Sequence, residues 1–184
     1  MARPRTASDA EIVARVSGYL AQREWPAASW ALAEVAPAAG LSPAGLVKRF
    51  GSREGLLLAL GRHWVDGIPS APTTAEPLTE LRWFARDMFL VPTAAAAVGG
   101  IGDLVADLAS ATAAATLAEG RAKQHGYVAA LLRKLAYPRA GEPELAARIL
   151  LDALHGVLLS QAADAAGVAL SPDDTIDYFL ELWI

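Results

Sequence analysis

The chain has 184 residues, of which 54% are hydrophobic, and a formal net charge of −4. It contains no cysteine, which excludes a disulfide framework and a thiolate metal site and fits a reducing cytoplasm. Two apolar stretches, 93–117 and 145–169, are interrupted by charged residues, so neither offers the roughly 18 apolar residues of a membrane span. We therefore expect a cytoplasmic protein that has no membrane partner.

The first predicted helix covers residues 8–23. Ser8 followed by Glu11 is the sequence signature of a capping box, in which each side chain binds a backbone N–H of the other residue. Apolar residues then recur at the spacing of one helix face, at Ile12, Val16, Tyr19 and Leu20. We expect these side chains to face a small core.

Residues 32–60 predict three short helices, and the turn between the first two is informative about function. The first helix, 32–39, stops at Gly40. The second begins where Ser42 supplies a capping hydroxyl and Pro43, which has no N–H to lose, occupies the first helical position. Two helices joined by a tight glycine-containing turn form a helix-turn-helix, whose second helix can enter the major groove of DNA.

The third helix of this segment leads to a predicted domain boundary. Ser52 is its capping residue, and the helix is expected over 53–65. The segment 68–77 is polar and rich in proline, which is typical of a linker. We therefore predict two domains, a head over 1–67 that binds DNA and a body over 68–184.

The helix-turn-helix resembles that of the TetR family of one-component transcriptional regulators. The matching residues are Val35-Ala36, Ala39-Gly40-Leu41-Ser42-Pro43, Leu46, and Phe50-Gly51-Ser52-Arg53-Glu54-Gly55-Leu56. The resemblance implies an all-α protein, in which a three-helix DNA-binding domain precedes a helical domain for ligand binding and dimerisation. The chain departs from the family pattern at three positions. The family usually has a Thr or Ser near Ala31, a Thr at Gly45 and a Tyr at Val47.

The second helix of the motif supplies most of the predicted DNA contacts. Leu46 and Phe50 lie one turn apart and are expected to anchor this helix to the core of the head. The predicted DNA-binding residues are Ser42, Pro43, Ala44, Gly45, Val47, Lys48, Arg49 and Arg53. Lys48 and Arg49 suit guanine edges or phosphates, whereas Val47 or Ala44 suits a thymine methyl group.

Charge is distributed unevenly along the chain. Residues 1–65 hold eight of the 16 basic residues and five of the 20 acidic ones, a net charge of +3 there and −7 in the rest. A basic end on an acidic body favours a protein that presents this end to double-stranded DNA. The alternative is an ordinary solvated basic surface.

The body is predicted to be helical because it is rich in alanine and leucine and lacks alternating β-branched runs. The expected helices are 78–90, 111–136, 144–166 and 171–183. Between the first two, glycines at 99, 100 and 102 are expected to interrupt a helix, with Asp103 beginning another.

The body also carries the predicted ligand pocket. Its candidate residues are Trp83, Phe84, Met88, Phe89, His125, Tyr127 and His155. The resemblance implies a cavity for a small apolar or amphipathic effector, and ordinary core packing is the alternative. Asp103 and Asp107 share a helix face and are interpreted as solvent-exposed.

Two helix faces near the end of the chain, one lined by small residues and one by bulky apolar residues, predict a homodimer. The predicted interface residues are Ala153, Gly156, Ala163, Ile176, Phe179, Leu180 and Trp183. The resemblance implies that the two helices pair with their copies across a two-fold axis, whereas burial within one subunit is the alternative. A helix-turn-helix protein that reads a palindrome needs two heads about 34–36 Å apart.

No catalytic constellation is visible. The three histidines do not form HExxH, and GxSxG and the P-loop are absent, so we predict no enzyme activity, no metal and no cofactor. The leading hypothesis is a ligand-responsive dimeric transcriptional regulator, a repressor that binds a palindromic operator. The alternative is a helical dimer whose degenerate DNA-binding head leaves it as a ligand-binding or protein-interaction module.

Overall fold

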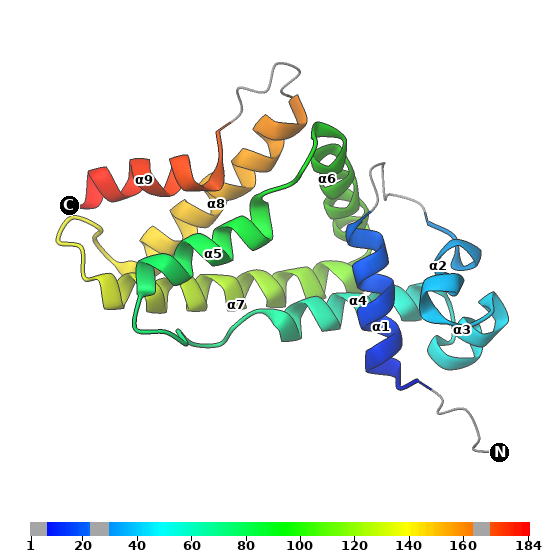
Figure 1. Ribbon diagram of the computed structural model, residues 1–184. Helices are drawn as coiled ribbons and strands as arrows, with labels where there is room; N and C mark the ends of the chain where they lie inside the picture. Colours follow the sequence, from blue (N-terminus) through cyan, green and yellow to red (C-terminus); the bar gives the residue numbers. More distant parts are fainter. Residues whose placement is uncertain (1–6, 23–29, 164–169) are drawn as a thin grey trace.

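The protein is all-α in the residues that the computed structural model describes, 7–22, 30–163 and 170–184 (Figure 1). These residues form nine helices. In chain order they are α1 (Asp9–Ala21), α2 (Leu32–Ala39), α3 (Pro43–Phe50), α4 (Arg53–Gly67), α5 (Pro77–Phe89), α6 (Ala94–Leu108), α7 (Ala111–Leu135), α8 (Pro143–Ala163) and α9 (Pro172–Trp183). The chain turns by 83° between α5 and α6.

Helices α1 to α3 and the start of α4 enclose a small core at one end of the molecule. Its buried side chains are Ile12, Val13, Val16, Trp30, Val35, Ala36, Ala39, Leu46 and Leu56. Val16 is fully buried and Leu20 half-buried, but Tyr19 is 37% exposed, so the prediction that it faces the core was wrong. The capping box of Ser8 and Glu11 is confirmed, and α1 ends at Ala21. The predicted final residue, Arg23, lies outside the described residues.

The turn between α2 and α3 has the predicted local chemistry. Gly40 ends α2 in the left-handed conformation with φ of 67°, which glycine adopts without the steric cost of a Cβ atom. The N–H of Leu41 then bonds to the carbonyl of Ala36 at 3.1 Å. The Ser42 hydroxyl accepts the N–H of Gly45 at 3.1 Å and so caps α3. These caps fix where α2 ends and where α3 begins, because they satisfy backbone groups left unpaired at helix termini.

A second, larger core lies among α5, α7, α8 and α9. Its fully buried side chains include Leu81, Leu131, Leu150, Leu154 and Ile176. Helix α7 lies along the body and contacts α4, α5, α6 and α8 (Figure 1). It is therefore the element through which the head, by way of α4, is attached to the body.

Close packing joins α4 to α7. A Cβ atom added to Gly120 would lie 2.0 Å from the indole ring of Trp64, so the ring occupies the space that only glycine leaves free. One turn earlier on α4, Gly61 lies against Thr116 of α7. A Cβ atom added to Gly61 would lie 3.1 Å from the Cγ2 atom of Thr116. Lys123 donates to the carbonyl of Val65 at 2.8 Å. These contacts hold α4 firmly against α7.

The predicted break in the glycine-rich segment is wrong. Helix α6 continues through Gly99, Gly100 and Gly102, and Asp103 lies in its interior. Glycine in a helix costs about 1 kcal/mol relative to alanine. Ala97 and Gly99 are buried, and α6 packs on α7 and α8. Tertiary packing therefore outweighs the weak helix propensity of this segment.

Helix α8 is long and strongly apolar. By length and composition it could cross a membrane, with a mean hydropathy of 1.3 over its most apolar window. A core helix of a soluble protein meets the same test. Leu150, Leu151 and Leu154 of α8 lie in the core of the body. The predicted extension of this helix over 164–166 lies outside the described residues.

Candidate functional site

Helix α3 presents a largely exposed surface. Leu46 is fully buried and Phe50 half-buried, which anchors one side of the helix to the core as the sequence predicted. The other side carries exposed Pro43, Ala44 and Val47, with Val47 43% exposed, together with Lys48 and Arg49. Small and apolar side chains next to a lysine leave room for a partner to approach the helix closely.

The arginine of α3 already has partners within the chain. The Arg49 guanidinium lies 3.1 Å from a carboxylate oxygen of Asp9, at the start of α1. It also donates to the carbonyl of Ala7. Arg49 therefore has to exchange these partners before it can bind a phosphate or a base. Lys48 makes no ion pair in the described part of the chain and is the more available cation.

Arg53, at the start of α4, is also held in place. Its Nε donates to the carbonyl of Trp30 at 2.8 Å, and its guanidinium carbon lies 4.5 Å from the centre of the Trp30 ring. This is the geometry of a cation–π contact. Arg53 therefore fastens Trp30 to α4, a structural role that the sequence did not predict.

Ser42 and Gly45 complete the predicted DNA-binding set. The hydroxyl of Ser42 is already engaged as the cap of α3. A Cβ atom at Gly45 would lie 3.4 Å from that hydroxyl, an ordinary contact distance. A Cβ atom, as in the Thr of the family pattern, therefore fits at this position.

The predicted ligand residues divide between a groove and the core. Trp83, Phe84, Met88 and Tyr127 line an open groove of about 940 Å³ between α5 and residues 67–76, which we call the linker groove. Trp83 is 71% exposed at its edge. Phe84 and Tyr127 pack edge to face, with ring centres 5.1 Å apart.

Glu80, a buried residue of the linker groove, already has hydrogen-bond donors around its carboxylate. Glu80 accepts hydrogen bonds from both the N–H and the hydroxyl of Thr73 and Thr74, at 2.8–3.0 Å, and from the hydroxyl of Tyr127 at 2.7 Å. Burial opposes its ionisation, but these donors outweigh burial and lower the pKa of Glu80 to about 2. Burial and Glu80 together raise the pKa of Tyr127. Glu80 thus holds the linker against α5 and α7.

The remaining predicted pocket residues lie elsewhere. Phe89 and His155 line neither the linker groove nor the cavity described below, and their rings pack edge to face at 4.8 Å. His155 Nδ1 lies 2.7 Å from the carbonyl of Leu151, and burial lowers the pKa of His155. His125 lines neither space, and burial lowers its pKa as well. The structure thus does not bring all seven predicted residues to one of these two spaces: Phe89 is buried in the core, and His125 and His155 are half-buried outside both.

The predicted dimer stripe of α9 is also buried within one chain. Ile176, Leu180 and Trp183 are 0%, 7% and 8% exposed and pack in the core of the body, and Phe179 is half-buried against it. These residues do share one face of α9, as their spacing predicted, but this face packs against the core of the same chain. On α8, Gly156 and Ala163 are exposed and Ala153 is half-buried.

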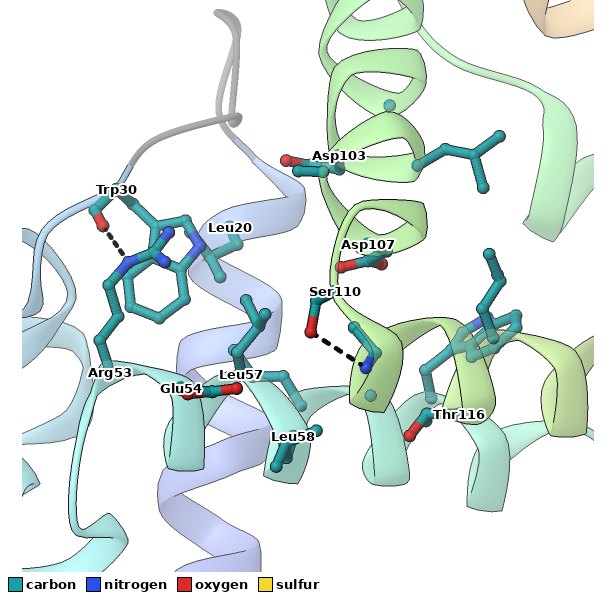
Figure 2. Close-up of a pocket in the computed structure, with 18 residues that line it drawn as sticks. Leu20, Trp30, Arg53, Glu54, Leu57, Leu58, Asp103, Asp107, Ser110 and Thr116 are labelled. Carbon is teal, nitrogen blue, oxygen red and sulfur yellow. Dashed lines mark hydrogen bonds between the residues drawn. The ribbon is translucent and has the colours of Figure 1, made fainter.

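A cavity that the sequence analysis missed lies where the head meets the body. We call this space, of about 620 Å³, the junction cavity. Leu20 and Trp30 line it from the head, α4 contributes Leu57 and Leu58, and α6 and α7 close the opposite side (Figure 2). Side chains of the head and of α6 and α7 therefore meet here without filling the space between them.

Three acidic residues face the junction cavity. Asp103 and Asp107 point into it from α6, and Glu54 lines it from α4 (Figure 2). Burial raises the pKa of Asp107, and no hydrogen bond or ion pair joins its side chain to another residue of 7–22, 30–163 or 170–184. The i, i+4 spacing of Asp103 and Asp107 was the available signal, but it was interpreted as solvent exposure.

No group of three or more metal-ligating side chains comes together in the part of the chain that the structure describes. No family model, curated protein or solved structure matches the chain. Its function is therefore argued from the geometry of the α3 surface and the junction cavity.

Proposed function

We propose that the protein is a homodimeric, ligand-responsive transcriptional regulator, a repressor that binds a palindromic operator through α3. The observation that carries the proposal is the exposed side of α3, which follows a glycine turn and is anchored by Leu46. A helix with this support can lie in a major groove while the preceding helix crosses the backbone. Lys48 faces solvent on the same helix.

The charge distribution supports the same proposal. Net charge is +3 over residues 1–65 and −7 over the rest. Phosphate contacts by cations supply much of the affinity of a DNA-binding protein and make it depend on salt. The acidic body is repelled by DNA, so the uneven charge orients the head toward it.

Exposed apolar residues on α8 and α9 support a dimer. Leu145, Ile149 and Leu159 of α8 are 54%, 48% and 62% exposed, and Tyr178 and Leu182 of α9 are 63% and 51% exposed. Gly156 lies on α8 between Ile149 and Leu159, at i+7 from the first, where its lack of a side chain permits close helix approach. Asp152, which pairs with Arg121, lies on the same face of α8, so this surface is apolar at its two ends and charged between them. Exposed large apolar side chains grouped on one helix face favour association. We therefore place the dimer interface on the outer faces of these helices.

Selection of bound sequences from random double-stranded DNA tests the function. The full chain is expected to enrich an inverted repeat. Lys48→Ala should weaken binding to the selected sequence and lower the slope of log affinity against log salt by about 1, because one phosphate or base contact is lost. Lys134→Ala, which removes the same charge from an exposed site on α7, should bind like wild type. Absence of an enriched inverted repeat would sink the proposal.

Sedimentation tests the dimer. We expect wild type to be dimeric at micromolar concentration and Leu159→Glu to be monomeric, because two charges would be buried in the interface. Ala14→Glu, at an exposed residue of α1 in the head, gives a control that should stay dimeric. A wild-type monomer, or a Leu159→Glu dimer as stable as wild type, contradicts this interface.

A second function is favoured by the occupied arginines. Arg49 is paired with Asp9, and Arg53 is bound to Trp30. A head whose cations already have partners suits a helical dimer that binds a ligand or another protein without DNA. Asp9→Asn separates the two functions. If Arg49 serves DNA, releasing it should strengthen binding to the selected sequence, whereas a head that does not bind DNA gains nothing.

A further inference from the structure

The junction cavity differs from an ordinary packing gap in its size and its walls. Its volume of about 620 Å³ lies within the range of small-molecule sites, which is roughly 300–1,000 Å³. One wall is the head, at Leu20 and Trp30, and the other is α6 of the body (Figure 2). An occupant would therefore touch the head and α6 at once.

The walls combine apolar surface with negative charge. Leucines from α1, α4 and α6 and two tryptophans, Trp30 and Trp64, supply the apolar part. Among the described residues of the lining, three acidic side chains, Glu54, Asp103 and Asp107, face the space, and the arginine, Arg53, is bound to Trp30. Negative groups and aromatic faces both attract a cation, and the leucines attract an apolar body.

We propose that the junction cavity binds an organic cation with an aromatic or aliphatic body, held by the Asp107 carboxylate beside Asp103 and Glu54. Asp107 is half-buried and makes no ion pair in the described residues, so a cation would supply the partner that its partly desolvated charge lacks. The tryptophan faces and leucine side chains would cover the apolar part.

The linker groove does not fit the same ligand. Its buried carboxylate, Glu80, already accepts five hydrogen bonds from Thr73, Thr74 and Tyr127. The other charged residues that line this groove are Glu76, Arg86 and Asp87, and Arg86 pairs with Asp173. The two spaces therefore differ in the state of their partly or fully buried carboxylate, which has hydrogen-bond donors at Glu80 but none within the described residues at Asp107, although both have apolar and aromatic walls.

Occupancy of the junction cavity would act on the position of the head, an effect that rests on the proposed function. Helix α4 lines the cavity from Arg53 to Trp64 and packs tightly against α7 where Trp64 meets Gly120. A ligand between α1 and α6 would therefore favour one orientation of the head relative to the body. A ligand shifts such an equilibrium only through its different affinity for the two states.

Calorimetry on the full-length protein tests the site. The probe is 4-phenylbutyltrimethylammonium, and the matched anion is 4-phenylbutyrate, which has a similar apolar body. We expect wild type to bind the cation and not the anion. Asp107→Asn should weaken cation binding about tenfold or more, while Asp87→Asn, an equal charge change at the linker groove, should bind like wild type.

A steric variant tests the location without changing charge. Gly100 lines the junction cavity and has no neighbour within 4 Å of an added Cβ, so Gly100→Leu should fill the space and abolish binding. Gly126→Leu places the same side chain at another open position of a helix and should bind the cation normally. Thermal unfolding by circular dichroism verifies that each variant is folded.

The outcomes separate this inference from the proposed function. Failure of wild type to bind the cation, equal binding of the anion, or unchanged binding by folded Asp107→Asn and Gly100→Leu overturns the cation site. Loss through Asp87→Asn alone places the ligand in the linker groove and also overturns it. DNA selection is performed without ligand, so an enriched inverted repeat would keep the regulator proposal even if the cation site fails.

Discussion

The linker groove and the junction cavity hold carboxylates in opposite situations. Glu80 is buried but surrounded by donors, which lower its pKa to about 2 despite burial. Asp107 is half-buried, and burial raises its pKa because no described residue compensates its charge. A carboxylate with all its partners present stabilises the fold, whereas one that lacks them is available to a ligand. The difference lies in the neighbours rather than in the residue type.

The largest expected effect comes from removing the satisfied charge. Glu80→Gln replaces two acceptor oxygens with an amide whose NH₂ group faces existing donors, so we expect a loss of about 2–3 kcal/mol in the free energy of unfolding. Urea denaturation measures it. Glu76→Gln, at an exposed residue beside the same linker, should change the free energy of unfolding by less than about 0.5 kcal/mol.

The same carboxylate should make stability depend on pH. Because the folded pKa of Glu80 is about 2 and its ordinary value is 4.5, its contribution is complete above pH 4.5 and disappears as the pH falls toward 2. The difference in unfolding free energy between wild type and Glu80→Gln should shrink across this interval. A difference that does not vary with pH would mean that the charge of Glu80 does not hold the linker.

A smaller effect is expected at the clamp that fixes one side of the junction cavity. Gly120→Ala places a methyl group about 2.0 Å from the Trp64 ring, so the ring must move. We expect a loss of about 1–2 kcal/mol, the usual cost of overpacking a core. Gly126→Ala on the same helix has open space and should stabilise the protein slightly, since alanine is the better helix former. If both variants behave alike in urea denaturation, α4 is not clamped at this point.

The smallest effect is expected at Asp107. Its pKa is raised, so its ionised form opposes folding, and Asp107→Asn should stabilise the protein at pH 7 by less than about 1 kcal/mol because solvent screens a half-exposed charge. The gain should vanish as the pH falls below the ordinary value of 3.8, where the carboxyl is protonated in both states. Destabilisation at pH 7 would show that Asp107 has a partner within the protein and would end the contrast with Glu80.

Local signals in the sequence predicted much of the fold. Ser42 and Pro43 mark the start of α3, Gly40 marks the end of α2, and the cap at Ser171 marks the start of α9. These features involve neighbours within one or two turns, so the sequence contains all the interacting groups. Helix α6 was mispredicted because its stability depends on packing against α7 and α8, which the sequence of 94–108 alone does not contain.

The candidate sites were harder to predict because they depend on distant residues. Arg49 meets Asp9 from 40 positions away, and Glu80 meets Tyr127 from 47 positions away. The apolar spacing of α9 predicted an apolar face correctly, but it did not reveal whether Ile176 faces the same chain or a second copy. The junction cavity required the relative placement of α1, α4 and α6, which no local pattern contains.

In the proposed regulator, α3 of each subunit lies in a major groove of DNA. The chain has no cysteine, so Val47→Cys supplies a single thiol on the exposed side of α3 for a tethered iron chelate that cleaves nearby DNA. On the selected inverted repeat, we expect cleavage at two symmetric positions separated by about one helical turn or a multiple of it. Cleavage that is absent, or that matches the pattern from a control chelate attached by Lys134→Cys at an exposed site on α7, would contradict this placement.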